Sequence, residues 1–255
     1  MAKSNNWTRE ETIVAFNVYC KIPFKSSRKT NPTIIKYANI IGRSPSALNM
    51  KVGNFGRLDP ELKKQGITGL ENGSKLEEEI WNEFNGNWDK LAFESEKLIA
   101  EFQNKTIEQI ETFDLEDLPK GEERETTIKT RVNQSFFRSA ILSSYNLKCC
   151  ITGLSIPQLL SASHIKPWKI DTENRTNPHN GLCLSNIHHQ AFDEGFITVT
   201  PDYKIKVSKH FDDFKKDEAV SDFFLKYENQ SIILPDRFLP NKDFLNWHYH
   251  EIFKR

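Results

Sequence analysis

The sequence has few cysteines and no long apolar run. Its 255 residues contain four cysteines, Cys20, Cys149, Cys150 and Cys183. They are too few and too scattered for a disulfide framework, so we expect a reducing compartment, the cytoplasm. No apolar stretch approaches the roughly 20 residues that a membrane helix requires. The opening letters MAKSNNWTREET also lack the apolar core of a secretory signal.

The chain also lacks net charge, because 35 basic and 35 acidic side chains balance. A neutral total counts against a protein whose whole surface binds nucleic acid. The charge is unevenly distributed, however. Residues 21–64 hold ten Lys and Arg against two Asp and Glu, and residues 71–101 hold nine acidic against three basic side chains. The basic segment is compatible with a phosphate-facing surface and equally with an ordinary solvated helix face.

Apolar residues are plentiful enough for folded cores. They make up 37% of the chain, with 18 Phe and 5 Trp, and the length fits two domains. The acidic stretch 114–125 lacks periodicity and contains a proline and a glycine, which is typical of a linker. We therefore predict a helical domain over residues 1–113 and a second domain over residues 126–255.

The first domain contains a pattern that resembles a helix-turn-helix. Gly42 ends one predicted helix and Ser44 caps the next, which has a proline at its first position. Two short helices joined by a tight turn form a DNA-reading motif, although any helical hairpin gives the same pattern. Arg43 and Lys51 lie at the edge of the second helix and on it, so both are candidate DNA-binding residues.

Other elements follow from periodicity and from glycine and proline positions. Thr8 and Glu11 form a capping box at the first helix. Apolar residues recur every three or four positions over residues 75–102, and Gly86 divides this pattern into two helices. The second half predicts a helix over 126–146, strands over 158–165 and 180–185, a helix over 186–194 capped by Asn186, a hairpin over 196–208 and a tail over 234–253 that packs back on the domain.

Four polar residues of the second domain have the chemistry of a hydrolytic centre. His189 and Asp193 lie one helical turn apart, so they share a helix face and can hold a divalent ion. A neutral imidazole such as His164 can take a proton from water near pH 7, and the amide of Asn180 can orient that ring. A lone histidine is more often a satisfied core residue. The joint spacing is what indicates phosphodiester hydrolysis.

The segments SASHIKPW and NGLCLSNIHHQAFDEGFITV resemble the HNH nucleases, also called ββα-metal nucleases. They are most similar to the branch found in bacterial restriction and defence enzymes. The preceding segment RVNQSFFRSAILSSYNLKCCITGL is similar to the same branch, and the resemblance spans about residues 131–199. It implies an α+β fold, with the helical N-terminal domain followed by a ββα-metal nuclease domain.

By this resemblance His164 matches the general base and Asn180 the residue that positions it. His189 and Asp193 match the metal ligands. Many members have a metal-binding acid or histidine just before the base. This chain has Ser163 there, a poor ligand that stays a candidate for metal or substrate contact. The resemblance then implies an ion held by two side chains, waters and phosphate oxygens. We expect Mg²⁺, with Mn²⁺ as a substitute.

Two further sets of residues leave alternatives open. His188 is a second candidate for metal or substrate contact, and otherwise packs. Arg138 and Lys166 are candidate phosphate contacts, and ordinary surface charge explains either one equally well. Some HNH proteins carry a structural zinc. The matching positions here are Cys149, Thr152, Ser185 and His188, and because two of the four are not zinc ligands we expect no structural zinc.

The sequence therefore predicts a metal-dependent endonuclease. The resemblance implies a restriction or defence enzyme that cuts foreign double-stranded DNA, with base-modified DNA among the candidate substrates. One centre cuts one strand, so a homodimer is a candidate assembly. The alternative is a helix-turn-helix regulator with a degenerate, non-catalytic HNH domain, which the missing acid at Ser163 favours. An RNA or a structure-specific substrate would use the same chemistry.

Overall fold

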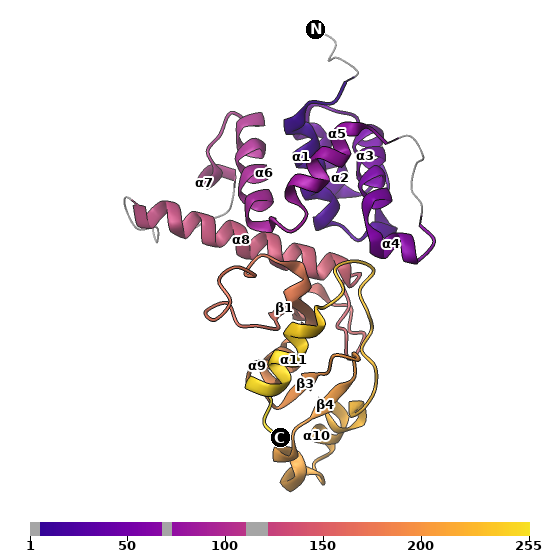
Figure 1. Cartoon of the computed structure of the whole chain (residues 1–255), viewed down its shortest axis with the longest axis vertical. Coiled ribbons are helices and arrows are strands. Elements are labelled where there is room, and N and C mark those ends of the chain that lie inside the picture. The colour runs from indigo at the N-terminus through magenta and orange to yellow at the C-terminus, as the bar shows by residue number, and fades with distance from the viewer. Residues whose placement is uncertain (1–5, 68–72, 111–121) are drawn as a thin grey trace. The chain divides into compact units, whose positions relative to one another are not determined.

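The structure is a computed structural model that describes residues 6–67, 73–110 and 122–255, with only the main chain of residues 122 and 123 (Figure 1). The chain forms two compact units, Met1–Ser143 and Ser144–Arg255. The predicted linker lies outside the described residues except for its last four positions, which begin helix α8 (Glu122–Ser144). This helix groups with the first unit up to Ser143, and the predicted domain boundaries stay a prediction.

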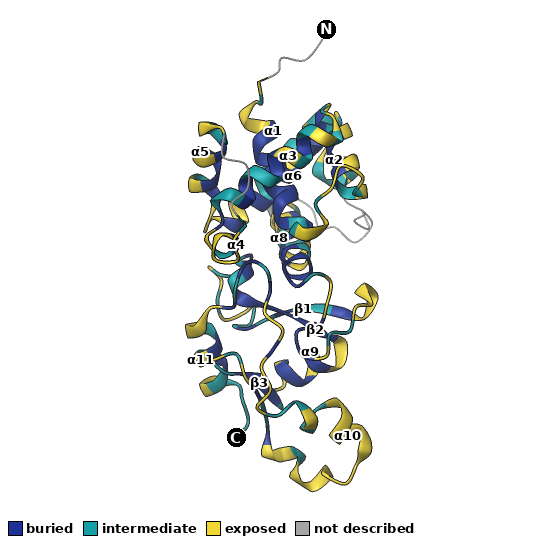
Figure 2. Cartoon of the chain, turned by 90° about the vertical axis from the view of Figure 1, so that its right-hand side faces the viewer, coloured by how far each residue is buried: buried dark blue, intermediate teal, exposed yellow. Residues whose placement is uncertain are grey.

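Helices make up the described part of the first unit. The packing centre is α1, in which every residue from Glu11 to Cys20 is buried (Figure 2). The ring of Phe16 stacks on Phe55 at 4.7 Å and lies 5.2 Å from that of Trp81. The elements are α1 (Arg9–Lys21), η1 (Phe24–Ser26), α2 (Pro32–Ile41), α3 (Pro45–Leu58), α4 (Pro60–Lys64), α5 (Lys75–Phe84), α6 (Trp88–Phe102), α7 (Ile107–Ile110) and α8.

Local capping explains where these helices begin and end. The Thr8 hydroxyl accepts from the Glu11 amide and the Glu11 carboxylate accepts from the Thr8 amide, so the predicted capping box is confirmed. Gly42 ends α2 at a φ of 66°, a left-handed conformation that glycine adopts without strain. Gly86, at a φ of 96°, lies between α5 and α6 as predicted. Among the helices that the structure describes, none is both long and apolar enough to cross a bilayer.

The second unit is built on two strands and a helix. Strand β1 (Leu160–His164) pairs antiparallel with β2 (Gly181–Ser185), in a register that sets His164 opposite Gly181. Helix α9 (Asn186–Asp193) follows directly. Its N-cap is Ser185, so the predicted cap at Asn186 is wrong: the Asn186 side chain instead accepts a hydrogen bond from the Ser161 hydroxyl.

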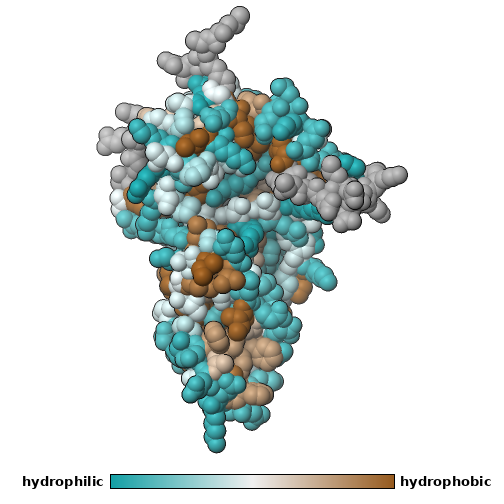
Figure 3. All heavy atoms as spheres, turned by 180° about the vertical axis from the view of Figure 1, so that it is seen from behind, coloured by the Kyte–Doolittle hydropathy of each residue, from teal (hydrophilic) through white to brown (hydrophobic). Residues whose placement is uncertain are grey.

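The remaining elements cover this core. Strands β3 (Ile197–Val199) and β4 (Ile205–Val207) form the predicted hairpin. The tail folds back as predicted, because α11 (Lys242–Glu251) packs against β3. Apolar side chains are interspersed with polar ones on the face shown in Figure 3. The α+β prediction is confirmed. The other short helices of this unit are η3 (Pro157–Leu159), η4 (Pro178–Asn180), η5 (Lys209–Phe214), α10 (Glu218–Phe223) and η6 (Leu225–Tyr227).

Candidate active site

The strand–strand–helix core brings three predicted site residues to one cavity. His164 comes from the end of β1, and His189 and Asp193 come from one face of α9. All three line a cavity of about 290 Å³. The ring of Trp168 and the C-terminal helix, through His248, complete its wall. The geometry therefore places an imidazole and a helix-borne His–Asp pair around a common space.

The environment of His164 favours a neutral imidazole with a defined tautomer. Its Nε2 lies 2.9 Å from the main-chain oxygen of Arg175. A carbonyl oxygen only accepts, so in the neutral ring Nε2 carries the proton and Nδ1 carries the lone pair. Burial lowers the pKa of His164, with a smaller contribution from nearby His189, while the bond to Arg175 opposes the shift. A ring held neutral at physiological pH can act as a base.

The pair on α9 has the features of a cation site. His189 Nδ1 lies 3.5 Å from Asp193 Oδ1. This nitrogen is buried and makes no hydrogen bond with any described residue. Burial raises the pKa of Asp193, while His189 and a hydrogen bond from Ser163 oppose that shift. A buried ring nitrogen without a partner, beside a carboxylate oxygen, fits a divalent ion held by these two atoms.

Ser163 supports the carboxylate. It is fully buried, and its hydroxyl donates to Asp193 Oδ1 at 3.1 Å. This hydrogen bond orients the Asp193 side chain, and a contact of Ser163 with metal or substrate stays a prediction. Within the described ranges, no three or more His, Cys, Asp or Glu side chains group in a way that could hold a metal ion. The predicted ion held by two side chains, His189 and Asp193, stays a prediction.

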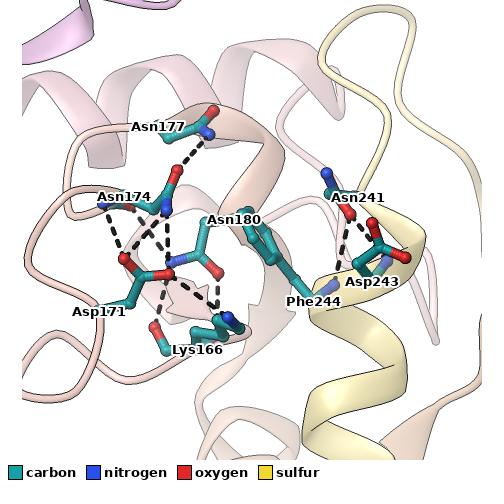
Figure 4. Close-up of polar contacts among 8 residues, drawn as sticks. All are labelled: Lys166, Asp171, Asn174, Asn177, Asn180, Asn241, Asp243 and Phe244. Atoms are coloured by element: carbon teal, nitrogen blue, oxygen red, sulfur yellow. Dashed lines mark hydrogen bonds and ion pairs between the residues drawn. The ribbon is translucent and has the colours of Figure 1, made fainter.

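The Asn180 side chain binds the main chain of the loop between β1 and β2. It is fully buried. Its Oδ1 accepts from the Lys166 amide at 2.8 Å, and its Nδ2 donates to the main-chain oxygens of Lys166 at 3.1 Å and Asn174 at 3.3 Å (Figure 4). Asn174 precedes Arg175, whose oxygen binds the ring. The amide thus sets the course of the chain segment that orients His164.

His188 lines a different cavity from the candidate centre. It is 1% exposed, and both ring nitrogens have protein partners at 2.7 Å, the Ser185 hydroxyl and the Phe223 main-chain oxygen. It lines a different cavity, of about 590 Å³, together with Phe223 and Tyr227. Because both nitrogens already have partners, the contacts favour the packing alternative over a metal contact.

Comparison with known families gives a match to part of the second unit. Residues 149–200 match the family model described as HNH endonuclease. The chain contains an HNH domain. The match includes β1, β2, α9 and β3, the elements that carry His164, Asn180, His189 and Asp193. HNH nucleases generally use a divalent metal ion, and His189 and Asp193 are the candidate ligands in this chain. A search of curated proteins found no match to the chain.

The two candidate DNA contacts of the first unit are engaged inside it. Arg43 donates to both carboxylate oxygens of Glu11 at 3.1 and 2.6 Å, and Lys51 Nζ lies 2.6 Å from Glu77. Both cations also lie over the ring of Trp7, at 5.1 and 4.8 Å from its centroid. These charges are already neutralised by buried acids, which argues against the predicted phosphate contacts.

The two helices of the predicted helix-turn-helix are present as α2 and α3, but the basic side chains of this segment pair with acidic side chains of the same unit. Arg57, near the end of α3, pairs with Glu78 at 3.1 Å. Basic residues of the 21–64 segment thus bind acids of the 71–101 segment. This arrangement favours the helical-hairpin alternative over a DNA-reading helix. The pairs are Lys21–Glu96, Lys51–Glu77 and Arg57–Glu78.

Lys166 and Arg138 lie in different units. Lys166 Nζ lies 3.7 Å from Asp171 and over the rings of Phe244 and Trp247, at 5.1 and 5.7 Å from their centroids. Its side chain is 25% exposed, so its charge reaches solvent only in part. Arg138 is exposed on α8. The role of each in phosphate binding stays a prediction.

Sequence reasoning missed two residues of the cavity wall. His248 packs on Phe192 with ring centroids 3.7 Å apart, and its nitrogens bond to the Thr198 hydroxyl and the Phe192 carbonyl. Burial lowers the pKa of His248 to about 4, so this wall is uncharged at neutral pH. The ring of Trp168 stands at 82° to that of His164. Trp168 lies four residues after His164, in the segment SASHIKPW that resembles HNH nucleases, so its position could have suggested a place near the site. No sequence signal indicated His248.

The cysteines of the HNH domain lie in its core. Cys149, Cys150 and Cys183 are fully buried. Burial raises the pKa of the Cys150 thiol, and the two neighbouring thiols add to the shift. The expectation that the domain lacks a structural zinc stays a prediction.

Proposed function

We propose that this protein is a metal-dependent endonuclease that hydrolyses phosphodiester bonds in double-stranded DNA. The observation that carries the proposal is the single cavity lined by His164, His189 and Asp193. It combines a base held neutral, a buried ring nitrogen without a partner and a carboxylate. These are the groups that metal-assisted hydrolysis requires, and a match to HNH endonucleases covers the elements that carry them.

Each residue has a distinct role in the proposed reaction. His164 Nδ1 takes the proton of the attacking water, while the Arg175 carbonyl holds the opposite side of the ring. Asn180 fixes the loop that carries this carbonyl. His189 Nδ1 and Asp193 Oδ1 would hold the divalent ion, for which we propose Mg²⁺, with Mn²⁺ as a substitute. When bound, the ion supplies positive charge to the phosphate and the leaving oxygen.

We further propose that the enzyme serves in restriction or defence against foreign DNA. The segments around residues 131–199 resemble that branch of HNH nucleases, and a helical unit precedes the HNH domain. Base-modified phage DNA is included among the substrates to be tested. Because one centre cuts one strand, we propose that two copies cooperate in a double-strand break.

Cleavage of supercoiled plasmid tests this function. The wild-type protein with Mg²⁺ should convert plasmid to nicked and linear forms, and a chelator should stop the reaction. His164→Ala should lose cleavage while staying folded. His210→Ala is the matched control, because this histidine is exposed on η5 of the same domain. DNA binding without cleavage of plain, methylated or hydroxymethylated DNA would instead favour the regulator.

A further inference from the structure

From the loop between β1 and β2 we infer that Asp171 and Asn174 are positioning residues for His164. They fix the segment that presents the Arg175 carbonyl, and this carbonyl selects the imidazole tautomer with its lone pair on Nδ1. The catalytic consequence rests on the proposed function, whereas the structural consequence does not. Figure 4 shows the polar contacts of this loop.

The first step is the contact between the two residues. Asp171 Oδ1 accepts from the Asn174 main-chain amide at 3.1 Å, and the Asn174 side-chain amide lies 3.0 Å from each oxygen of the carboxylate. Asn174 Oδ1 in turn accepts from Asn177 Nδ2 at 2.8 Å. The carboxylate therefore holds both the main chain and the side chain of Asn174.

The second step leads from Asn174 to the imidazole. The main-chain oxygen of Asn174 accepts from the buried Asn180 amide at 3.3 Å, and the next residue provides the oxygen that lies 2.9 Å from His164 Nε2. Asn174 is therefore fixed through its side chain by Asp171 and through its carbonyl by Asn180. Two independent anchors on one residue define where the following carbonyl points.

Arg175 is held from its other end as well. Its Nε donates to the Trp168 main-chain oxygen at 2.8 Å, and its guanidinium lies over the Trp168 ring at 5.1 Å. This ring packs edge-on with that of His164 and lines the cavity. Side chain and main chain of Arg175 thus brace the base from two directions.

Asp171 does not act on the reacting atoms directly. Its side chain is 13% exposed, and its counter-ion is Lys166 at 3.7 Å. Among the described residues, those that line the cavity do not include Asp171 or Asn174. The pair therefore acts through the Arg175 carbonyl, which makes it a positioning pair.

Loss of the carboxylate should release Asn174 and let the Arg175 carbonyl turn away. His164 would then populate both neutral tautomers, and the fraction with a proton on Nδ1 cannot act as the base. The mixture of tautomers accounts for a few-fold loss of kcat, and the loss of the fixed ring orientation adds to it. We expect kcat to fall roughly 10- to 100-fold in total, the size typical of partners that orient a catalytic or metal-bound group, with little change in KM.

The test is the tautomer of His164, read from the ¹⁵N chemical shifts of its ring nitrogens in histidine-labelled, metal-free full-length protein at pH 8. The wild type should show the proton on Nε2. Asp171→Ala should shift the ring toward a mixture, and Asp171→Asn, which keeps one acceptor oxygen, should lie nearer the wild type. Glu173→Ala is the control, because Glu173 is exposed in the same loop.

Asn174→Ala is a second variant, since it removes the side-chain contacts and leaves the main-chain carbonyl in place. A wild-type tautomer in both folded alanine variants overturns the inference, as does an equal change in Glu173→Ala. The measurement needs no cleavage. A tautomer that shifts as expected in a protein that cuts no DNA would support the positioning pair and reject the proposed nuclease.

Discussion

The histidines of the HNH domain differ in how their ring nitrogens are used. His188 and His248 place both nitrogens on protein atoms, and both are buried. His189 keeps one buried nitrogen without a hydrogen-bond partner, beside Asp193. His164 binds a main-chain carbonyl through Nε2 and lines the cavity. The hydrogen-bond partners of each ring therefore distinguish the histidines that pack in the core from those with a proposed catalytic or metal-binding role.

The burial of His164 predicts the pH dependence of cleavage. Burial lowers the pKa of this ring below its ordinary value of 6.5. Only the neutral ring accepts a proton, so activity should be lost as the pH falls through the lowered pKa and should be level above it. The acidic limb of kcat/KM at saturating Mg²⁺ should have its midpoint below pH 6.5. A midpoint above that value would contradict a buried base.

His248 predicts a pH dependence of stability. Burial lowers the pKa of His248 from 6.5 to about 4 in the folded protein, so between these values the unfolded chain binds a proton that the folded chain does not. The contribution is complete above pH 6.5 and is lost as the pH falls toward 4. This linkage amounts to about 3 kcal/mol of the free energy of unfolding.

His248→Gln removes this titration and keeps a polar side chain. Denaturant unfolding between pH 7 and pH 4 should show a smaller loss of stability in the variant than in the wild type. Equal pH dependence of the two proteins would show that His248 titrates normally in the folded state.

At the scale of elements, ion pairs in the first unit connect the basic segment 21–64 to the acidic segment 71–101. Lys51 of α3 and Glu77 of α5 form an ion pair whose side chains are 7% and 0% exposed. The Glu77 carboxylate also accepts from the Asn54 side chain and the Ser74 amide. The pair thus connects α3 to the N-terminus of α5. This structural role is sufficient to explain why Lys51 is buried.

Removing one partner of this pair should be costly. Lys51→Met leaves a buried carboxylate without its counter-ion and should lower the free energy of unfolding by about 3–5 kcal/mol. Lys63→Met, on the exposed side of α4, should change it by less than about 0.5 kcal/mol. Equilibrium unfolding in urea measures both. A Lys51→Met protein of normal stability that binds DNA more weakly would restore the predicted phosphate contact.

Regular elements were predictable from sequence, and irregular ones were not. Helix ends at Thr8 and Gly42 follow from capping chemistry, and β1, β2 and α9 follow from short apolar runs and helical spacing. The loop between Lys166 and Asn180 has no period, so its side-chain hydrogen bonds and the Arg175 carbonyl could not be predicted. The acidic partners of Arg43 and Lys51 could not be predicted for another reason. They lie in other helices, and spacing along one helix does not reveal them.

At the scale of the whole chain, the proposed centre occurs once per chain within the described residues. A single centre cuts one strand at a time, so nicked plasmid should appear before linear plasmid. Linear product should rise more steeply than in proportion to protein concentration if two copies cooperate. A gel time course at several protein concentrations measures this. Linear product without a nicked intermediate at low protein concentration would contradict independent single-strand cuts.

The central claim is that His164 and the His189–Asp193 pair act together at one cavity. A double-mutant cycle with His164→Ala and Asp193→Asn in single-turnover plasmid cleavage tests it most directly, with Glu194→Gln, at the C-cap of the same helix, as the control. Each single change should slow cleavage at least about 100-fold, and the double variant should lose little beyond the slower single variant, because members of one centre are not additive. Losses that multiply, or a single variant that cuts at the wild-type rate, would contradict the claim.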